Sequence, residues 1–193
     1  SDSLNYFRRL LPEIGVLHSV RIECRSYLPD WRLERSYRET YSARASDGGV
    51  LRDMIHEIDY AGWLFGWPDA VYALLGNTGR LDIEAEEWAE LVWTGHCGAS
   101  VTVGLDYLTR IPRRGILACG AAGTLAWDAI GQAVTFSPAG KPVGQSVSTQ
   151  TRVELFASQA QAFARAVAGK PDERLAVGGD GFLALAVCDA ARV

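Results

Sequence analysis

Alternating apolar and charged residues predict a β-strand near the start of the chain. Over residues 16–25 the apolar side chains, such as Val20 and Ile22, fall on one side, and the charged ones, such as Arg21, fall on the other. This period of two is typical of a strand with one buried face. Residues 3–11 precede it with apolar residues at helical steps and Pro12 behind them, which predicts a short helix.

Beyond residue 69 the pattern changes to short apolar strands separated by turns. The expected strands are residues 70–75, 88–94, 100–108, 115–119, 124–128 and 133–136. Residues 95–98 read as a hairpin turn, and residues 137–147, rich in Pro, Gly and Ser, as a loop. Short connections favour antiparallel pairing. The predicted fold class is therefore α+β, with a largely antiparallel open sheet of about six strands and helices packed on one face.

Some of these strands carry apolar side chains on both faces. In residues 88–94, Ala89, Leu91 and Trp93 share one face while Trp88 and Val92 share the other. Helices can cover only one of the two faces, and a large exposed apolar face usually marks a protein contact. We therefore expect a homo-oligomer that forms through the open sheet face.

Two further helices are predicted in the last quarter of the chain. Residues 151–168 carry an apolar stripe that is expected to pack in the core, formed by Val153, Phe156, Ala160, Phe163 and Val167. Gly169 and Pro171 end this helix, and Asp180 is expected to cap a last helix over residues 182–191.

Residues 47–66 form the most informative stretch, and their pattern predicts one helix with Asp47 as its cap and Gly66 as its end. Asp53 and His56 are three residues apart and so share a face, and Asp59 lies three further on. A histidine beside a carboxylate is the basic unit of proton-transfer chemistry. The spacing alone more often belongs to a structural or solvated ion pair, so both interpretations stay open.

Residues 27–46 have no period and combine aromatic residues with arginines. Flat rings and guanidinium forks suit a sugar ring or a phosphate, and Trp31, Tyr41 and Arg44 are the candidates. The alternative is a surface lid whose aromatic side chains pack on the core. Residues 120–123 contain a glycine pair after a strand, but the chain continues as another strand, which favours a turn over a phosphate loop.

Composition limits the classes of function. The 193 residues, 48% of them hydrophobic and 22% charged, are typical of one globular domain. A net charge of −4 without a basic run argues against a nucleic-acid partner. No apolar run approaches the ~20 residues of a membrane span, and the first residues do not resemble a signal peptide, so a cytoplasmic location is expected.

The four cysteines have no short paired spacing, which favours free thiols in a reducing compartment over two disulfides. His96 and Cys97 are the only metal-like pair, and without a second pair no metal site is expected.

Several separated motifs resemble one known family. The central run GGVLRDMIHEIDYAGWLFG, with SYLPDW and YSAR before it and GTLAWD and GGDG after it, resembles the second domain of the glucose-fructose oxidoreductase / inositol dehydrogenase / rhizopine-catabolism (Gfo/Idh/MocA) family. The resemblance implies that His56 faces the nicotinamide ring and the substrate, and it favours substrate contact for Trp31, Tyr41 and Arg44. Many family members have an acid four residues before this histidine, where this chain has Arg52; here Asp53 stands three before it.

The resemblance therefore implies that residues 1–193 are the single C-terminal, substrate-binding and oligomerising domain of an NAD- or NADP-dependent oxidoreductase. The substrate would be a CH–OH group of a sugar or sugar nucleotide, with His56 and Asp53 as catalytic residues and Arg52 among the substrate contacts. The family's N-terminal Rossmann domain, with its glycine fingerprint and Glu-Lys-Pro lysine, is not in the sequence. The alternatives are a non-catalytic sheet domain for ligand binding or assembly, and a cofactor-free acid–base enzyme such as a lyase.

Overall fold

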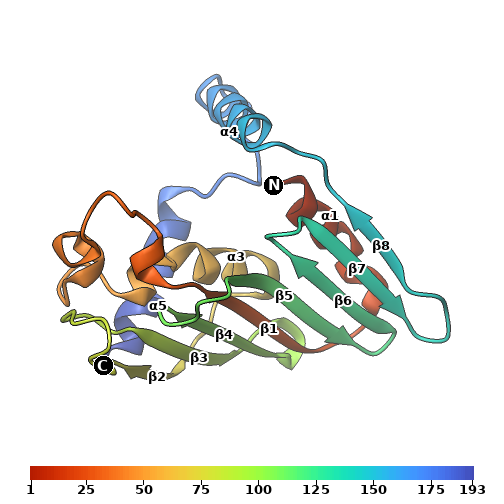
Figure 1. The fold of residues 1–193 in the computed structure, drawn as a ribbon. Coiled ribbons are helices and arrows are strands. Elements are labelled where there is room, and N and C mark those ends of the chain that lie inside the picture. The colour runs from red at the N-terminus through yellow and green to blue at the C-terminus, as the bar shows by residue number, and fades with distance from the viewer.

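The computed structural model describes residues 1–193 except for the side chain of Cys97. Its centre is one eight-stranded sheet in the order β2-β3-β4-β1-β5-β6-β7-β8 (Figure 1). The strands are β1 (Leu17–Arg25), β2 (Tyr72–Gly76), β3 (Trp88–Thr94), β4 (Ser100–Asp106), β5 (Arg113–Gly120), β6 (Gly123–Asp128), β7 (Ala133–Pro138) and β8 (Gly144–Val147). β1 and β4 pair in parallel, and every other neighbouring pair is antiparallel.

The prediction of a mostly antiparallel open sheet in an α+β fold is confirmed, but the strand number of about six is wrong. The additional strand β8 lies inside residues 137–147, which were expected to be a loop. All of its side chains are exposed, so it has no buried face to produce an alternating pattern. It joins the sheet through backbone pairing with β7, which sequence periodicity cannot reveal.

One face of the sheet carries the hydrophobic core. A row of directly opposed, buried residues crosses six strands in register: Leu91, Val103, Ile22, Ile116, Trp127 and Val134. Helix α1 (Asp2–Leu10) reaches this face where Ser3 accepts a 3.0 Å hydrogen bond from the Trp127 indole. Helix α3 (Ile55–Phe65) contacts β1 and β4, and α5 (Gly178–Ala191) contacts α3 and β2.

The opposite face of the sheet is more polar than the sequence pattern suggested. Its centre carries Arg21, Glu23 and Arg25 on β1, and the Arg25 guanidinium bonds Glu90 at 2.6 Å and Asp106 at 2.9 Å. Exposed apolar side chains gather on β2 and β3, at Tyr72, Leu74 and Val92. Leu117 on β5 is also exposed, but Thr102 and Arg21 lie between it and Val92. A patch toward one edge therefore replaces the expected continuous apolar face.

The predicted single helix over residues 47–66 is wrong, because the structure divides it. A short helix α2 (Val50–Asp53) ends at Met54, whose φ of −103° and ψ of 24° leave helical geometry, and α3 begins at the next residue. The buried Met54 side chain anchors this break in the core. The predicted end at Gly66 is confirmed, with a φ of 97° that favours glycine.

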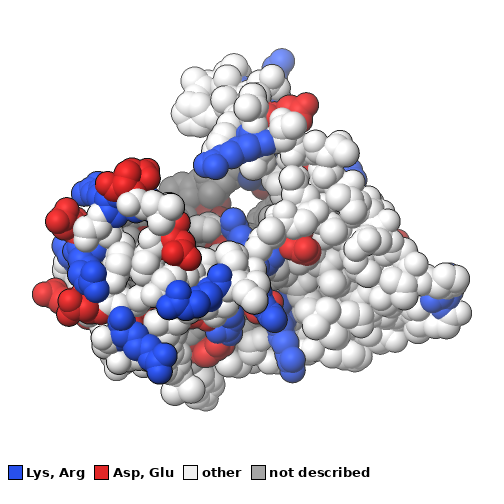
Figure 2. All heavy atoms as spheres, in the orientation of Figure 1, with Lys and Arg blue, Asp and Glu red and all other residues white. Residues whose placement is uncertain are grey.

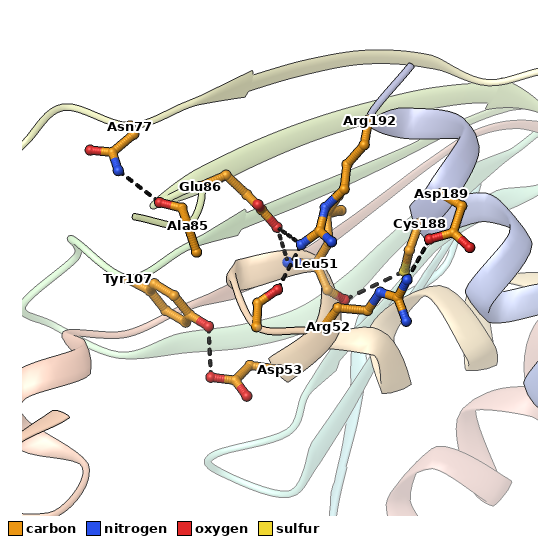
Figure 3. A network of polar contacts seen from close by, with 11 residues as sticks. Leu51, Arg52, Asp53, Asn77, Ala85, Glu86, Tyr107, Cys188, Asp189 and Arg192 are labelled. Atoms are coloured by element: carbon orange, nitrogen blue, oxygen red, sulfur yellow. Dashed lines mark hydrogen bonds and ion pairs between the residues drawn. The ribbon is translucent and has the colours of Figure 1, made fainter. Parts of the chain in front are cut away.

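Asp47 does not cap this segment, because a carboxylate from elsewhere in the chain takes that position. Gly49 is the residue before α2, and the Glu86 carboxylate accepts a hydrogen bond from the Leu51 amide at 3.3 Å. Arg192 binds the same carboxylate at 2.7 Å (Figure 3). The start of α2 is thus tied to the loop before β3 and to the last residues of the chain.

The glycine pair at residues 120–123 forms a strand turn, as predicted. Gly120 and Gly123 face each other across the end of the β5–β6 hairpin. A Cβ on Gly120 would lie 2.4 Å from the Ile14 carbonyl oxygen, so close backbone packing explains this glycine. No helix follows the turn, and the segment offers no helix N-terminus for a phosphate.

Helix α4 (Arg152–Val167) begins at Thr151 with a reciprocal capping box to Glu154, but its stripe is not in the core as predicted. Val153, Phe156, Phe163 and Val167 are 78%, 52%, 65% and 74% exposed. In Figure 1 the helix projects away from the sheet. Periodicity identifies the residues that share a face of a helix, but it does not identify what covers that face.

Three cysteines, Cys24, Cys119 and Cys188, are free thiols, and the side chain of Cys97 lies outside the described residues. Burial, followed by the nearby charge of Glu57, raises the pKa of Cys24 to about 12. Burial likewise raises the pKa of Cys188 to about 11. Within the described residues, no helix is both long and apolar enough to cross a membrane.

We predict that Gly49→Ala destabilises the fold by about 2 kcal/mol more than Gly79→Ala. Both glycines have a positive φ, of 82° and 72°. A Cβ at residue 49 would lie 2.3 Å from the Glu86 carboxylate, whereas nothing lies within 4 Å of a Cβ at residue 79. Urea unfolding of the two variants isolates the cost of the clash, and equal midpoints would contradict the prediction.

Candidate active site

His56 stands in the first turn of α3 with its side chain 50% exposed. Its ring atom Nε2 lies 3.0 Å from the Oε1 atom of Glu57, whose side chain is fully buried. Nε2 is thus the ring nitrogen in ion-pair contact with the carboxylate, although the contact lacks hydrogen-bond geometry. The pair is therefore an imidazole in ion-pair contact with a buried acid.

Glu57 keeps its negative charge despite its burial. Arg114 on β5 places Nε 2.9 Å from the same Oε1 atom. Burial acts to raise the pKa of Glu57, but the polar contact with His56 and the charge of Arg114 outweigh it and leave the pKa below its ordinary value. Burial and the Glu57 charge raise the pKa of the neighbouring Tyr60, so its hydroxyl stays protonated.

The structure thus gives Glu57 the contact with His56 that the sequence interpretation assigned to Asp53. Adjacent residues on a helix usually point in different directions, so the spacing rule passed over Glu57. The apolar residues Ile55 and Ile58 on either side of it do not by themselves predict that the charge of Glu57 is buried. The signal available was Glu57 itself, a charged residue at a position that the helical period assigns to the core side.

Asp53 belongs to a different cluster. It ends α2, and its Oδ2 atom accepts a 2.6 Å hydrogen bond from the hydroxyl of the buried Tyr107. Tyr41 approaches the same carboxylate, and hydrogen bonding to Asp53 raises the pKa of Tyr41 to about 12. The Trp31 ring meets the Tyr107 ring edge-on at 5.6 Å. The structure therefore brings Trp31, Tyr41 and Asp53 together, while no hydrogen bond or ion pair among the described residues joins Asp53 to His56.

Tyr107 was not a candidate in the sequence analysis. It follows β4 and continues the alternation of that strand, so it looked like an ordinary core residue. Only the contact between its hydroxyl and Asp53 distinguishes it (Figure 3).

Both candidate arginines have carboxylate partners. Arg44 lies 3.2 Å from Asp47 within its own exposed loop. Arg52 pairs with Asp189 on α5, as Figure 3 shows. Their charges are thus already matched inside the domain, and an anionic substrate would have to replace Asp47 or Asp189.

His56 borders a cavity of about 750 Å³ between α3, α1 and α4. Figure 2 shows the surface hollowed below α4. The wall on the sheet side carries His56, Asp59, Trp63, Trp67 and Arg114, whereas Trp31, Tyr41 and Arg44 are not among the lining residues. Burial, followed by the charge of Asp180, raises the pKa of Asp59. The cavity thus combines flat aromatic faces with carboxyl groups and a histidine.

A model of the GFO/IDH/MocA C-terminal domain matches residues 12–126, more than half of the chain. The chain belongs to the Gfo/Idh/MocA family. No curated protein matches it.

Solved structures of other Gfo/Idh/MocA oxidoreductases share the fold. Levoglucosan dehydrogenase in complex with NADH is 17% identical with a TM-score of 0.81. An oxidoreductase from Agrobacterium radiobacter in complex with NAD+, L-tartaric acid and magnesium is 18% identical with a TM-score of 0.77. UDP-N-acetylglucosamine 3-dehydrogenase from Acidithiobacillus ferrooxidans is 17% identical with a TM-score of 0.74.

These three structures cover 98% of this chain, and they do so with their C-terminal parts. This chain in turn spans 61%, 59% and 56% of their lengths, in the same order. At such low identities the similarity shows the fold, and the chain corresponds to somewhat more than half of each relative.

The described residues of this family member do not fit a whole dinucleotide. The turn at residues 120–123 packs against backbone, as shown above. A second glycine cluster, Gly178, Gly179 and Gly181, starts α5, but the Asp180 carboxylate already accepts a 2.8 Å hydrogen bond from the Val177 amide there. A carboxylate at a helix N-terminus repels a pyrophosphate. Within the described residues, no three His, Cys, Asp or Glu side chains gather as metal ligands either.

We predict that Glu57→Gln lowers the free energy of unfolding at neutral pH by about 3 kcal/mol, because it leaves the Arg114 charge without its buried partner. The lowered pKa of Glu57 means that its stabilisation is complete above the ordinary value of 4.5 and is lost as the pH falls through the lowered value. The difference between wild type and variant should therefore shrink in acid. Urea unfolding at several pH values measures both effects.

Glu23→Gln is the matched control, because Glu23 is 44% exposed and lies 3.6 Å from Arg25. Glu23→Gln should lower the free energy of unfolding by about 0.5 kcal/mol. An acid dependence in Glu57→Gln that equals that of the wild type would contradict the assignment of a buried, ionised Glu57.

Proposed function

We propose that residues 1–193 act as the substrate-binding and acid–base half of an NAD- or NADP-dependent oxidoreductase whose substrate is a hydroxyl group of a sugar or sugar nucleotide. Family membership supports an oxidoreductase domain. The observation that carries the proposal is the His56–Glu57 pair, in which a half-exposed imidazole on a cavity wall is held at 3.0 Å by a buried carboxylate.

In this proposal His56 takes the proton from the substrate hydroxyl at Nδ1, or returns it in the reverse direction. Glu57 holds the Nε2 proton and stabilises the imidazolium that forms. Arg114 keeps Glu57 ionised, so the acid does not take up the proton itself. A nicotinamide, when bound beside this domain, would supply the hydride acceptor that oxidation of the substrate carbon requires.

The cavity suits a sugar. Trp63 and Trp67 provide aromatic surface, with the Arg8 guanidinium already over the Trp63 ring at 4.5 Å, and Asp59 provides a hydrogen-bonding group next to His56. Trp31, Tyr41 and Asp53 remain candidates for further contacts, as one cluster around Tyr107. Arg44 and Arg52 are candidates for a substrate phosphate that would displace their present carboxylate partners.

The dinucleotide itself would be held by a separate domain. The described residues lack a fitting phosphate loop, and the relatives are longer than this chain. The domain assignment is therefore that of a C-terminal half that works beside a nucleotide-binding domain.

We predict that His56→Ala, made in the product of the complete reading frame that contains residues 1–193, lowers turnover by about 10²–10⁴-fold. Cofactor affinity should change little, because this chain does not hold the dinucleotide. The rate at which reduced nicotinamide forms from a panel of sugars and sugar nucleotides measures turnover. A fluorescence titration of the protein with the cofactor measures cofactor binding.

His18→Ala, at an exposed histidine on β1, is the control and should leave turnover unchanged. The kcat of Glu57→Gln should lie between those of His56→Ala and His18→Ala, with a nearly unchanged KM, because Glu57 acts through His56. Full turnover in His56→Ala would overturn the catalytic role and favour a non-catalytic domain for ligand binding or assembly.

We also propose that the chain forms a homo-oligomer through the open sheet face, at the patch of Tyr72, Leu74 and Val92. Leu74 is 69% exposed beside Tyr72 and Val92, which pair with each other across β2 and β3. Leu74→Glu should shift the protein to monomers in sedimentation velocity at micromolar concentration. Leu33→Glu, at a leucine in the 27–46 loop that is 84% exposed, should leave the assembly unchanged, and loss of assembly in both variants would contradict the proposal.

A further inference from the structure

Arg114 neutralises Glu57 with only part of its guanidinium group. On β5 it lies on the same side of the sheet as the buried Ile116 and Ala118, which is the side that the helices cover. Its side chain is nevertheless 37% exposed, and it lines the cavity together with His56. The exposed part of the guanidinium is therefore available to a molecule in the cavity.

The contacts of the guanidinium leave one nitrogen free. Its Nε atom lies 2.9 Å from Oε1 of Glu57, and Nη2 donates a 3.4 Å hydrogen bond to Oε2 of the same carboxylate. Nη1 makes no hydrogen bond with any residue that the structure describes. A guanidinium carries five N–H donors in a rigid fork, so one edge can hold a carboxylate while another binds a second oxygen.

His56 and this free edge belong to one wall of the cavity. Nε2 of His56 and Nε of Arg114 contact the same oxygen of Glu57, at 3.0 Å and 2.9 Å. The two side chains come from α3 and β5, and the fully buried carboxylate between them fixes how they lie relative to one another. A sugar ring carries hydroxyl groups on adjacent carbons, so a single molecule can reach both side chains.

The charges around the cavity favour a neutral oxygen at Arg114 over an anion. Glu57 already balances the guanidinium charge. Asp59 and Asp180 add two further carboxylates to the lining of the cavity. These charges would repel a phosphate or carboxylate at this position, whereas a hydroxyl oxygen can accept a hydrogen bond there without that cost.

We propose that Arg114 is a substrate-binding residue, whose free Nη1 edge donates a hydrogen bond to the sugar hydroxyl adjacent to the one that His56 deprotonates. This inference rests on the proposed function and narrows its substrate to a vicinal diol. The contact would hold the sugar ring in one orientation, with the reacting hydroxyl directed at His56. Arg114 would then serve both the charge of Glu57 and the position of the substrate.

The test compares Glu57→Gln with the double variant Glu57→Gln, Arg114→Met, both in the product of the complete reading frame that contains residues 1–193. Both lack the Glu57 charge, and methionine has no donor. For the panel sugar that the wild type oxidises fastest, KM should be about tenfold higher in the double variant, because a hydrogen bond from a charged group is lost. The double variant should unfold at a higher urea concentration than Glu57→Gln, since it no longer buries an unpaired charge.

Mono-deoxy analogues of the same sugar locate the contact. In the wild type, kcat/KM should fall about tenfold for an analogue that lacks one hydroxyl on a carbon next to the oxidised one. The double variant should no longer distinguish that analogue from the parent sugar. Arg114→Lys keeps a cation beside Glu57 without the second edge of the fork, and it should lose the same discrimination. A purely structural Arg114 would affect both sugars equally and leave the discrimination intact.

Arg38→Gln with Asp82→Asn is the matched control, because it removes an exposed ion pair of 3.3 Å outside the cavity lining. Its KM and its discrimination between the two sugars should equal those of the wild type. In an enzyme that oxidises sugars, an unchanged KM in the double variant with the analogue still rejected would overturn the inference alone. A wild type that oxidises no sugar of the panel would overturn the proposed function and this inference with it.

Discussion

The buried charge of Glu57 is the constraint that links the helix layer of this domain to its sheet. A carboxylate removed from water costs several kcal/mol unless a cation and hydrogen bonds compensate it. Arg114 compensates it from β5 and His56 from α3, so the position of α3 over the sheet is fixed by polar as well as apolar contacts. The same carboxylate is the group in ion-pair contact with Nε2 of His56. Stability and the orientation of the histidine therefore depend on one carboxylate.

The break in the helix at Met54 determines which polar residues contact one another on either side of it. A continuous helix would have placed Asp53 and His56 on one face, one turn apart. The change in backbone direction instead sends Asp53 to Tyr107 and leaves His56 beside Glu57. Two polar clusters result, one around a tyrosine hydroxyl and one around a buried ion pair. The chemistry suggested by the Asp–His spacing survives with a different acid.

Periodicity along a sequence reports which side chains share a buried or a solvated face. Alternation located β1 and the central strands, because each has one buried and one solvated face. It missed β8, which has no buried face, and it could not separate α2 from α3, because Met54 keeps the apolar period through the break. Family resemblance pointed to His56 and to the aromatic loop. The carboxylate beside His56 belongs to Glu57, and its charge is compensated by Arg114, which lies 57 residues further along the chain on β5. Long-range ion pairs of this kind leave no local pattern.

The apolar stripe of α4 is a second feature whose surroundings periodicity does not report. Its period is helical and its capping box is complete, so the prediction of an amphipathic helix was sound. The error was to assume that an apolar stripe must pack within the same chain, whereas here the side facing the domain is the polar one. An apolar face directed away from its own core is favourable only when something else covers it. The apolar face lies on the outer side of α4, and the inner side of the same helix lines the cavity beside His56. A contact that orders α4 therefore also shapes this cavity.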